Sequence, residues 1–177
     1  MKEKIKKLEN LKEKIIKETK EKVWFYSEEY EEYKKPALRY GMKGWIWTQA
    51  IFFIGSNPSK NPSKDPPSMN FFFKELKLNK FKNAHLTDLV KIRTKGTEAD
   101  KVIEENLKKQ KKYLDEEIEI LKPKLIVVMG NRCKEFIEGL GYKNLHFIIH
   151  YSATRFTHHK KRFIKEMRDV RKKYEGL

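Results

Sequence analysis

The chain has 177 residues, enough for one domain with a substantial hydrophobic core but short for two domains. Lysine and arginine total 41 residues against 25 aspartates and glutamates, and the net charge of +16 favours a polyanionic partner such as DNA, RNA or an acidic membrane face. No apolar run reaches the roughly 18 residues of a spanning helix, and the chain starts with charged residues rather than an apolar signal segment. We therefore expect a soluble, cytoplasmic protein with no membrane partner.

The first 44 residues are predicted to form a helical extension that packs on the core domain. Residues 2–23 carry apolar side chains at helical spacing between charged ones. This stripe consists of Ile5, Leu8, Leu11, Ile15, Ile16 and Val23. We expect it to pack on the domain rather than to bind a coiled-coil partner. Residues 24–35 are predicted to continue as a second helix, and Pro36 interrupts the pattern, so the domain begins near Trp45 and extends to residue 177.

From Trp45 onward, predicted strands and helices alternate. Apolar runs predict four strands, at about 50–55, 83–90, 124–129 and 145–150. Helical periodicity predicts helices at about 71–78, 98–121, 131–139 and 158–174, and Thr157 is expected to cap the last one. Alternation of this kind, with strands that are apolar on both faces, is typical of a parallel sheet covered by helices. The predicted fold class is therefore α/β, a three-layer α/β/α sandwich with a four-stranded parallel sheet.

Three of the predicted strands end in polar segments. These segments are Gly55–Ser59, Thr87–Lys91 and His150–Arg155. Because the right-handed crossover rule brings the carboxyl ends of parallel strands to one edge of the sheet, we expect the three segments to meet there. Ligands of open α/β sheets bind at this edge, so it is the predicted functional site.

The motifs at these exits resemble those of the uracil-DNA glycosylase superfamily. Residues 55–59 read Gly-Ser-Asn-Pro-Ser, similar to the Gly-x-Asn-Pro-Gly motif of its mismatch-specific and single-strand-selective branches. Residues 87–93 read Thr-Asp-Leu-Val-Lys-Ile-Arg, similar to the Thr-Asn-x-x-Lys-x-Arg of its thermophile-type branch. Residues 150–155, His-Tyr-Ser-Ala-Thr-Arg, resemble a last motif that begins His-Pro-Ser, and residues 119–130 resemble the stretch that enters strand three. The resemblance covers about residues 48–156.

This resemblance implies a monofunctional DNA glycosylase of base excision repair, which removes a deaminated base, uracil first of all, and leaves an abasic site. By resemblance, Asn57 positions the attacking water, and His150 donates an N–H to the leaving base. A neutral histidine suits that role, although the sequence does not fix its pKa or tautomer. The alternatives are an asparagine that only shapes the turn and a strand-end histidine that bonds to backbone.

Further residues are assigned to DNA by the same resemblance. The predicted phosphate contacts are Gly55, Ser56, Ser59, Lys91, Ser152 and Arg155, of which Arg155 has the alternative role of a wedge in the duplex. Phe71 is the candidate for stacking under the flipped base, while at least one of its neighbours Phe72 and Phe73 must be core. The partner is single- or double-stranded DNA with a damaged base, and we expect a monomer associated with the nucleoid.

Asp88 is the main departure from the family pattern, because many members have an asparagine there that reads the base. An ionised aspartate only accepts hydrogen bonds, so it would face uracil O4 with negative charge. Three explanations stay open: Asp88 is protonated through burial, it points away and pairs with Lys91 or Arg93, or the base is not uracil. Asp88 and the missing Pro of the last motif both favour a rival interpretation, a DNA- or nucleotide-binding protein that does no hydrolysis.

Metal and cofactor chemistry are not expected. The single cysteine, Cys133, excludes a four-cysteine iron–sulfur cluster within one chain, such as the thermophile-type branch carries. The five histidines lack acidic or cysteine partners at ligand spacing. A nucleotide-processing enzyme is a weaker reading, since neither standard Gly-rich phosphate loop is present. The 37% of charged residues fits a thermophilic origin and an AT-rich genome equally well.

Overall fold

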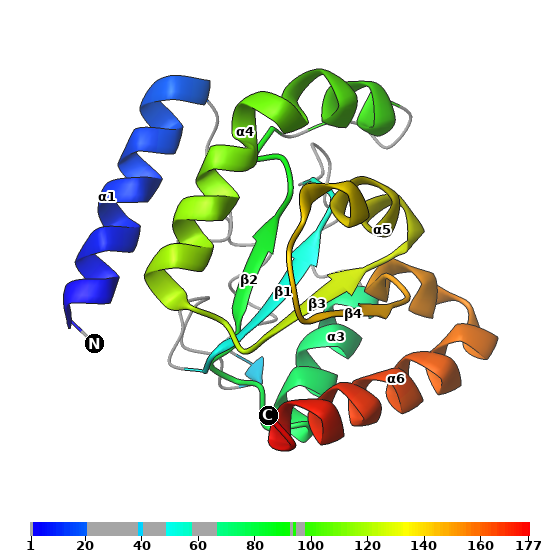
Figure 1. The fold of residues 1–177 in the computed structure, drawn as a ribbon. Helices are drawn as coiled ribbons and strands as arrows, with labels where there is room; N and C mark the ends of the chain where they lie inside the picture. Colours follow the sequence, from blue (N-terminus) through cyan, green and yellow to red (C-terminus); the bar gives the residue numbers. More distant parts are fainter. Residues whose placement is uncertain (1, 21–38, 41–48, 58–66, 93, 95–97) are drawn as a thin grey trace.

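A four-stranded parallel sheet forms the centre of the chain in a computed structural model that describes residues 2–20, 39–40, 49–57, 67–92, 94 and 98–177 (Figure 1). The strands are β1 (Ile51–Gly55), β2 (His85–Asp88), β3 (Leu125–Met129) and β4 (Leu145–Ile148), arranged in the order β2-β1-β3-β4. The central strands β1 and β3 are buried along their whole length, which explains their uninterrupted apolar sequences. The predicted parallel sheet is confirmed.

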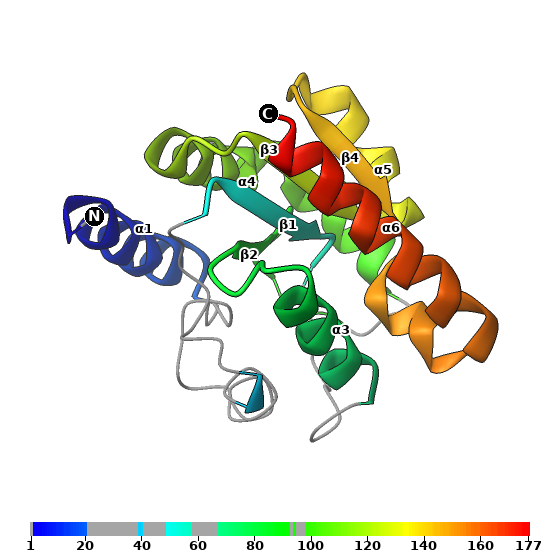
Figure 2. The ribbon, with the colours of Figure 1, turned by 90° about the horizontal axis from the view of Figure 1, so that it is seen from below.

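Helices cover both faces of this sheet, as the three-layer prediction requires. They are α1 (Lys2–Thr19), α3 (Pro67–Leu78), α4 (Ala99–Leu121), α5 (Asn131–Ile137) and α6 (Thr157–Glu175), with short 3-10 helices η3 (Glu138–Leu140) and η4 (Tyr151–Arg155). Helices α4 and α5 lie on one face, and α3 and α6 on the other (Figures 1 and 2). The chain crosses the sheet in opposite directions from β1 to β2 and from β2 to β3, so right-handed crossovers place α3 and α4 on opposite faces.

The two central strands diverge at their carboxyl ends. The chain leaves β1 toward α3 on one face, and it leaves β3 toward α5 on the other face. Neighbouring parallel strands whose connections run to opposite faces leave a crevice between their ends, and such crevices hold the ligands of open α/β sheets. The fold therefore places a site between the exits of β1 and β3.

Helix α1 packs on the outer side of α4 (Figure 1). Its apolar stripe is buried in the core at Leu8, Leu11 and Ile15, and Lys14 forms an ion pair with Glu116 of α4 at 2.7 Å. The helix ends at Thr19, earlier than predicted. The predicted second helix and the predicted start of the domain lie outside the described residues, so the boundary at residue 44 stays a prediction.

Three predicted boundaries are wrong in detail. Strand β2 stops at Asp88. The N–H of Leu89 makes the last ladder bond to the Gly55 carbonyl, and the next N–H, of Val90, donates to the Ser56 carbonyl, so the alternating bond pattern of a strand ends there. Strand β4 stops at Ile148, two residues before the predicted end. Thr157 is the first residue of α6 and not its cap; Phe156 precedes the helix and makes no side-chain capping bond.

Candidate functional site

Two adjoining cavities open at the carboxyl edge of the sheet. One, of about 300 Å³, has a polar lining that includes Ser56, Thr94, Asn131 and Arg132. The other, of about 260 Å³, is lined mainly by apolar residues together with Asp88. They share the residues Asn57, Met129, His150 and Ser152. We treat them as one hollow with a polar half and an apolar half. The predicted convergence of strand exits is thus observed.

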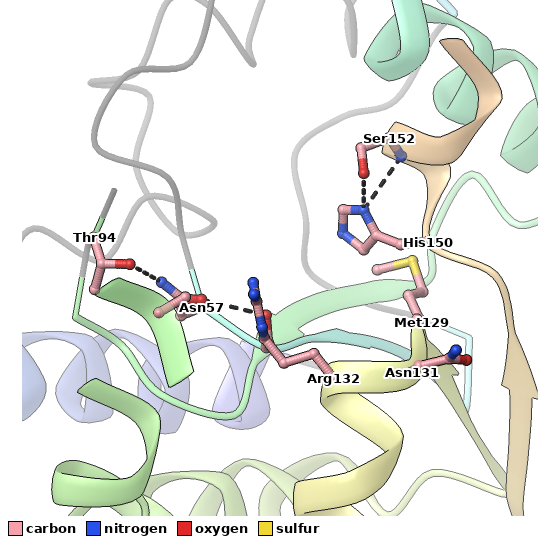
Figure 3. A pocket seen from close by; sticks show the side chains of 10 residues that line it. Asn57, Thr94, Met129, Asn131, Arg132, His150 and Ser152 are labelled. Atoms are coloured by element: carbon pink, nitrogen blue, oxygen red, sulfur yellow. Dashed lines mark hydrogen bonds between the residues drawn. The ribbon is translucent and has the colours of Figure 1, made fainter. Parts of the chain in front are cut away.

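His150 follows β4 and stands at the junction of the two halves. The backbone N–H of Ser152 donates to His150 Nδ1 at 3.2 Å, and the Ser152 hydroxyl lies 2.7 Å from the same nitrogen (Figure 3). A ring nitrogen that accepts from a backbone N–H carries no proton, so in the neutral ring the proton is on Nε2. Ser152 therefore selects the tautomer whose Nε2–H is a donor toward the hollow.

His150 is also held in its neutral state. Burial, and after it the positive charge of nearby Arg132, together lower its pKa from the usual 6.5 to about 4. Arg132 projects into the hollow between Asn57 and His150 (Figure 3). It is itself anchored to Asp100 at the start of α4 by two contacts of its guanidinium group. At pH 7 the ring of His150 is a neutral donor.

Asn57 stands on the opposite side of the hollow from His150 (Figure 3). Its amide Nδ2 donates to Thr94 Oγ1 at 2.8 Å, and Ser56 Oγ donates to its Oδ1 at 3.3 Å. The two hydroxyls fix the plane of the amide. A fixed amide oxygen beside an open hollow can orient a water molecule by accepting one of its hydrogens.

Asp88 is buried in the apolar half, directly beside Gly55 of the paired strand. A Cβ atom at position 55 would overlap Asp88 Oδ1, so glycine is the residue that leaves room for this carboxyl group. Asp88 therefore points into the site and not away from it. Gly55 has a packing role toward Asp88, and its predicted phosphate contact stays a prediction.

The aromatic wall of the apolar half comes from Phe72, Phe73 and Tyr151. Phe72 is stacked on Tyr151 with ring centroids 4.9 Å apart, and Tyr151 in turn lies 4.3 Å from the ring of His150. Phe71 does not line either cavity; it faces Phe163 of α6 at 6.0 Å. Phe71 is therefore not positioned to stack on a base in the hollow. Its neighbour Phe72, which lines the apolar half, becomes the candidate.

Lys91 is not a phosphate contact, which corrects the prediction. Its side chain is fully buried and forms an ion pair with Glu117 of α4 at 3.2 Å. Its ammonium group also donates to Thr87 Oγ1 and to the Asp88 carbonyl, each at 2.6 Å. The backbone N–H of Lys91 donates to Gln110 Oε1 at 2.7 Å. The ammonium group of Lys91 thus bonds to residues at the end of β2 and to Glu117, and its charge is buried away from DNA.

Of the other predicted DNA contacts, two line the hollow. Ser56 and Ser152 line it, and the Ser152 backbone and hydroxyl are engaged with His150. Arg155 is exposed at the end of η4, with its guanidinium 4.7 Å from the ring of the half-exposed Phe156. Ser59 lies outside the described residues. The phosphate roles of Ser56, Ser152 and Arg155 stay predictions.

Sequence reasoning missed Arg132, Thr94 and Tyr151. Arg132 comes three residues after β3, and the segment that follows this strand is not one of the three polar segments recognised in the sequence. Thr94 lies 37 positions after Asn57 in the sequence, so no local pattern indicates that the two side chains are hydrogen-bonded. Tyr151 occupies the position of the family's proline, and only the structure brings it against Phe72.

Within the described part of the chain, no group of three or more His, Cys, Asp and Glu residues is arranged to hold a metal ion. Over the same residues, no helix has the length and apolar character needed to cross a membrane.

The first prediction concerns the charge of His150. Replacing Arg132 by Gln removes a repelling charge, so the pKa of His150 should rise from about 4, while Arg132→Lys should keep it low. In the wild type, the unfolded chain binds a proton near pH 6.5 and the folded chain does so only near 4, so the free energy of unfolding should fall as the pH drops through this window. An NMR titration of the ring measures the pKa, and urea unfolding between about pH 4 and 7 measures the free energy of unfolding; an unchanged pKa in Arg132→Gln contradicts the electrostatic role.

The second prediction concerns the buried pair. Glu117→Ala should lower the free energy of unfolding by about 3–5 kcal/mol, because it leaves the Lys91 charge buried without its counter-charge. The double variant Lys91→Met/Glu117→Leu should recover most of this loss. Glu116→Ala, which removes the neighbouring exposed pair with Lys14, is the control and should cost less than about 1 kcal/mol. Urea unfolding measures all three, and equal losses for Glu116→Ala and Glu117→Ala refute the prediction.

Comparison with known proteins gives one family. The model of the family described as the Uracil DNA glycosylase superfamily matches residues 43–173. No curated protein matches the chain significantly.

Proposed function

The chain belongs to the uracil DNA glycosylase superfamily, and we propose that it is a monofunctional DNA glycosylase that removes a deaminated base, uracil in the first place, and leaves an abasic site. Family membership supports DNA glycosylase activity in general. The finer proposal is supported by one observation, the arrangement of His150 and Asn57 on opposite sides of one hollow. His150 is neutral and directs its Nε2–H toward the hollow, and the amide of Asn57 is held by two hydroxyls.

In the proposed reaction the target base leaves the DNA stack and enters the apolar half. Extrusion of a base costs a few kcal/mol, and contacts between the base and the aromatic wall of Phe72 and Tyr151 offset part of that cost. The net charge of +16 supports binding through phosphates, with Arg132, which lines the hollow, and the exposed Arg155 of η4 as candidate contacts.

Cleavage of the glycosidic bond moves negative charge onto the leaving base and positive charge onto the sugar. The Nε2–H of His150 stabilises the charge on a base carbonyl oxygen, which is the task of a preorganised donor in a partly buried site. Asn57 orients the water that attacks the sugar. An amide is a poor base, and this suffices where the leaving group departs largely by itself. Lys91 is buried in its ion pair, so it offers no amine for lyase chemistry.

Asp88 shapes the choice of base. An ionised carboxylate in the apolar half accepts a hydrogen bond from a base N–H or amino group and opposes a carbonyl oxygen. We propose that the base preference is relaxed relative to an asparagine at this position. Hypoxanthine, whose N1–H and O6 match the N3–H and O4 of uracil, then competes with uracil, and a base with an exocyclic amino group, such as cytosine, gains relative to both. Asp88 and Tyr151 depart from the family motifs and therefore favour a second candidate function, a protein that binds DNA through the same hollow without hydrolysis.

A third prediction tests catalysis. Oligonucleotides carrying uracil, hypoxanthine, xanthine or mismatched thymine, single- and double-stranded, are incubated with the protein and then treated with alkali to cleave abasic sites. We expect strand breaks that fall about 100–1000-fold in His150→Ala and about 100-fold in Asn57→Ala. Asn106→Ala on α4, which does not line the hollow, is the control. Salt-dependent binding without breaks would instead support the non-hydrolytic candidate.

A fourth prediction tests the choice of base. In Asp88→Asn, excision of uracil should rise relative to that of cytosine by at least about tenfold, because the amide can donate to uracil O4 where a carboxylate cannot. Hypoxanthine and xanthine also present a carbonyl oxygen, so their excision should rise together with that of uracil. The ratio of kcat/KM values for the four substrates measures the change, and Asp169→Asn on α6 serves as the control. If the ranking of substrates is the same in Asp88→Asn and wild type, Asp88 does not read the base.

A further inference from the structure

Glu166 of α6 reaches across to the end of β4. Its Oε2 accepts the backbone N–H of Ile149 at 2.8 Å, and its Oε1 accepts from Arg162 Nε at 2.7 Å. Its side chain is 19% exposed, against 60% for Arg162, so the carboxylate is largely enclosed between the helix and the strand end. Hydrogen bonds to an ionised acceptor are shorter and stronger than neutral ones, so this contact fixes the backbone at position 149 firmly.

The contact matters because β4 is an edge strand. Strand β3 lies on one side of it, and α6 runs past its other side (Figure 2). On the β3 side, Gly130 N–H donates to the Ile148 carbonyl at 2.8 Å. Gly130 has a φ of +88°, and a Cβ there would come within 2.9 Å of the His150 Cβ. The segment from Ile148 to His150 is therefore held by a glycine on one side and by Glu166 on the other.

We propose that Glu166 is a positioning residue for His150, an inference that rests on the proposed glycosylase function. Glu166 fixes the backbone, Ser152 fixes the ring, and together they aim Nε2–H at the base oxygen that gains charge. Without the carboxylate, Ile149 N–H turns to solvent at a free strand edge, and His150 loses one of its two supports. Misplacement of a catalytic group by about 1 Å costs roughly 100-fold in rate.

The variants separate this role from general effects on α6. Glu166→Ala removes the acceptor, and Glu166→Gln keeps an amide oxygen that can accept from Ile149 N–H. Glu175→Ala is the matched control, because Arg171 and Glu175 form the same i, i+4 pair at 2.8 Å at the far end of the helix. Lys173→Met removes a different contact between α6 and β4, the bond to the Leu145 carbonyl at the start of the strand.

The first readout is single-turnover base excision with DNA affinity measured in parallel. We expect Glu166→Ala to slow excision at least tenfold without a change in Kd for the oligonucleotide, Glu166→Gln to stay within about threefold of wild type, and both controls to match wild type. Circular dichroism and thermal unfolding establish that each variant is folded. An equal loss in Glu175→Ala, or a loss that lies wholly in Kd, overturns the proposal.

The second readout does not depend on activity. The ¹⁵N shifts of the His150 ring report its tautomer and the hydrogen bond that Nδ1 accepts from the Ser152 N–H. Because a shift of the backbone at position 149 weakens this bond, we expect Nε2–H in wild type and Glu166→Gln and a mixture of tautomers in Glu166→Ala. Identical ring shifts in Glu166→Ala and wild type overturn the positioning role, whatever the rates. If wild-type protein cleaves none of the substrates, the proposed function fails, while the ring shifts still decide whether Glu166 positions His150.

Discussion

The buried ion pair between Lys91 and Glu117 is the constraint on which the site depends. Both side chains are fully enclosed, so their charges are tolerable only because nearly every donor of Lys91 has a fixed partner. Those partners, Thr87 and the Asp88 carbonyl, belong to the end of β2, whereas Glu117 belongs to α4. The pair therefore locks α4 to the exit of β2 and fixes where the Asp88 side chain emerges. A shift of either element would separate two charges in a medium where separation is costly.

The same device is repeated at the other edge of the sheet. Strands β1 and β3 are held on both sides by neighbouring strands, but β2 and β4 each have one free side. Near the end of each edge strand a glutamate of a helix accepts a hydrogen bond, Glu117 from the Thr87 hydroxyl at β2 and Glu166 from the Ile149 backbone N–H at β4. All four exits are thus fixed before a ligand arrives. Electrostatic stabilisation in an active site depends on such preorganisation, because dipoles already in place need no further reorientation during the reaction.

The sequence predicted the sheet because burial on both faces leaves apolar runs that are easy to read, and it found Asn57 and His150 because polar residues directly follow two such runs. It could not predict the fate of Lys91, since a lysine in a polar exit looks the same whether its side chain turns to solvent or inward toward a glutamate 26 positions away. Phe71 and Phe72 differ by one helical step of about 100°, and only the packing of α3 on η4 and α6 decides which ring faces the hollow. Arg132 was missed because its segment carries no family motif.

The arrangement separates the proposed chemistry from the proposed choice of base. Asn57 and His150 come from the exits of β1 and β4, and their states are set by Thr94, Ser152 and Arg132, none of which belongs to β2. Asp88 comes from β2, whose exit is fixed by its own ion pair. A change at position 88 therefore alters what the apolar half accepts without disturbing the amide or the imidazole. An aspartate in place of the family's asparagine therefore bears on the proposed choice of base, while Asn57 and His150, the proposed hydrolytic pair, keep their own partners.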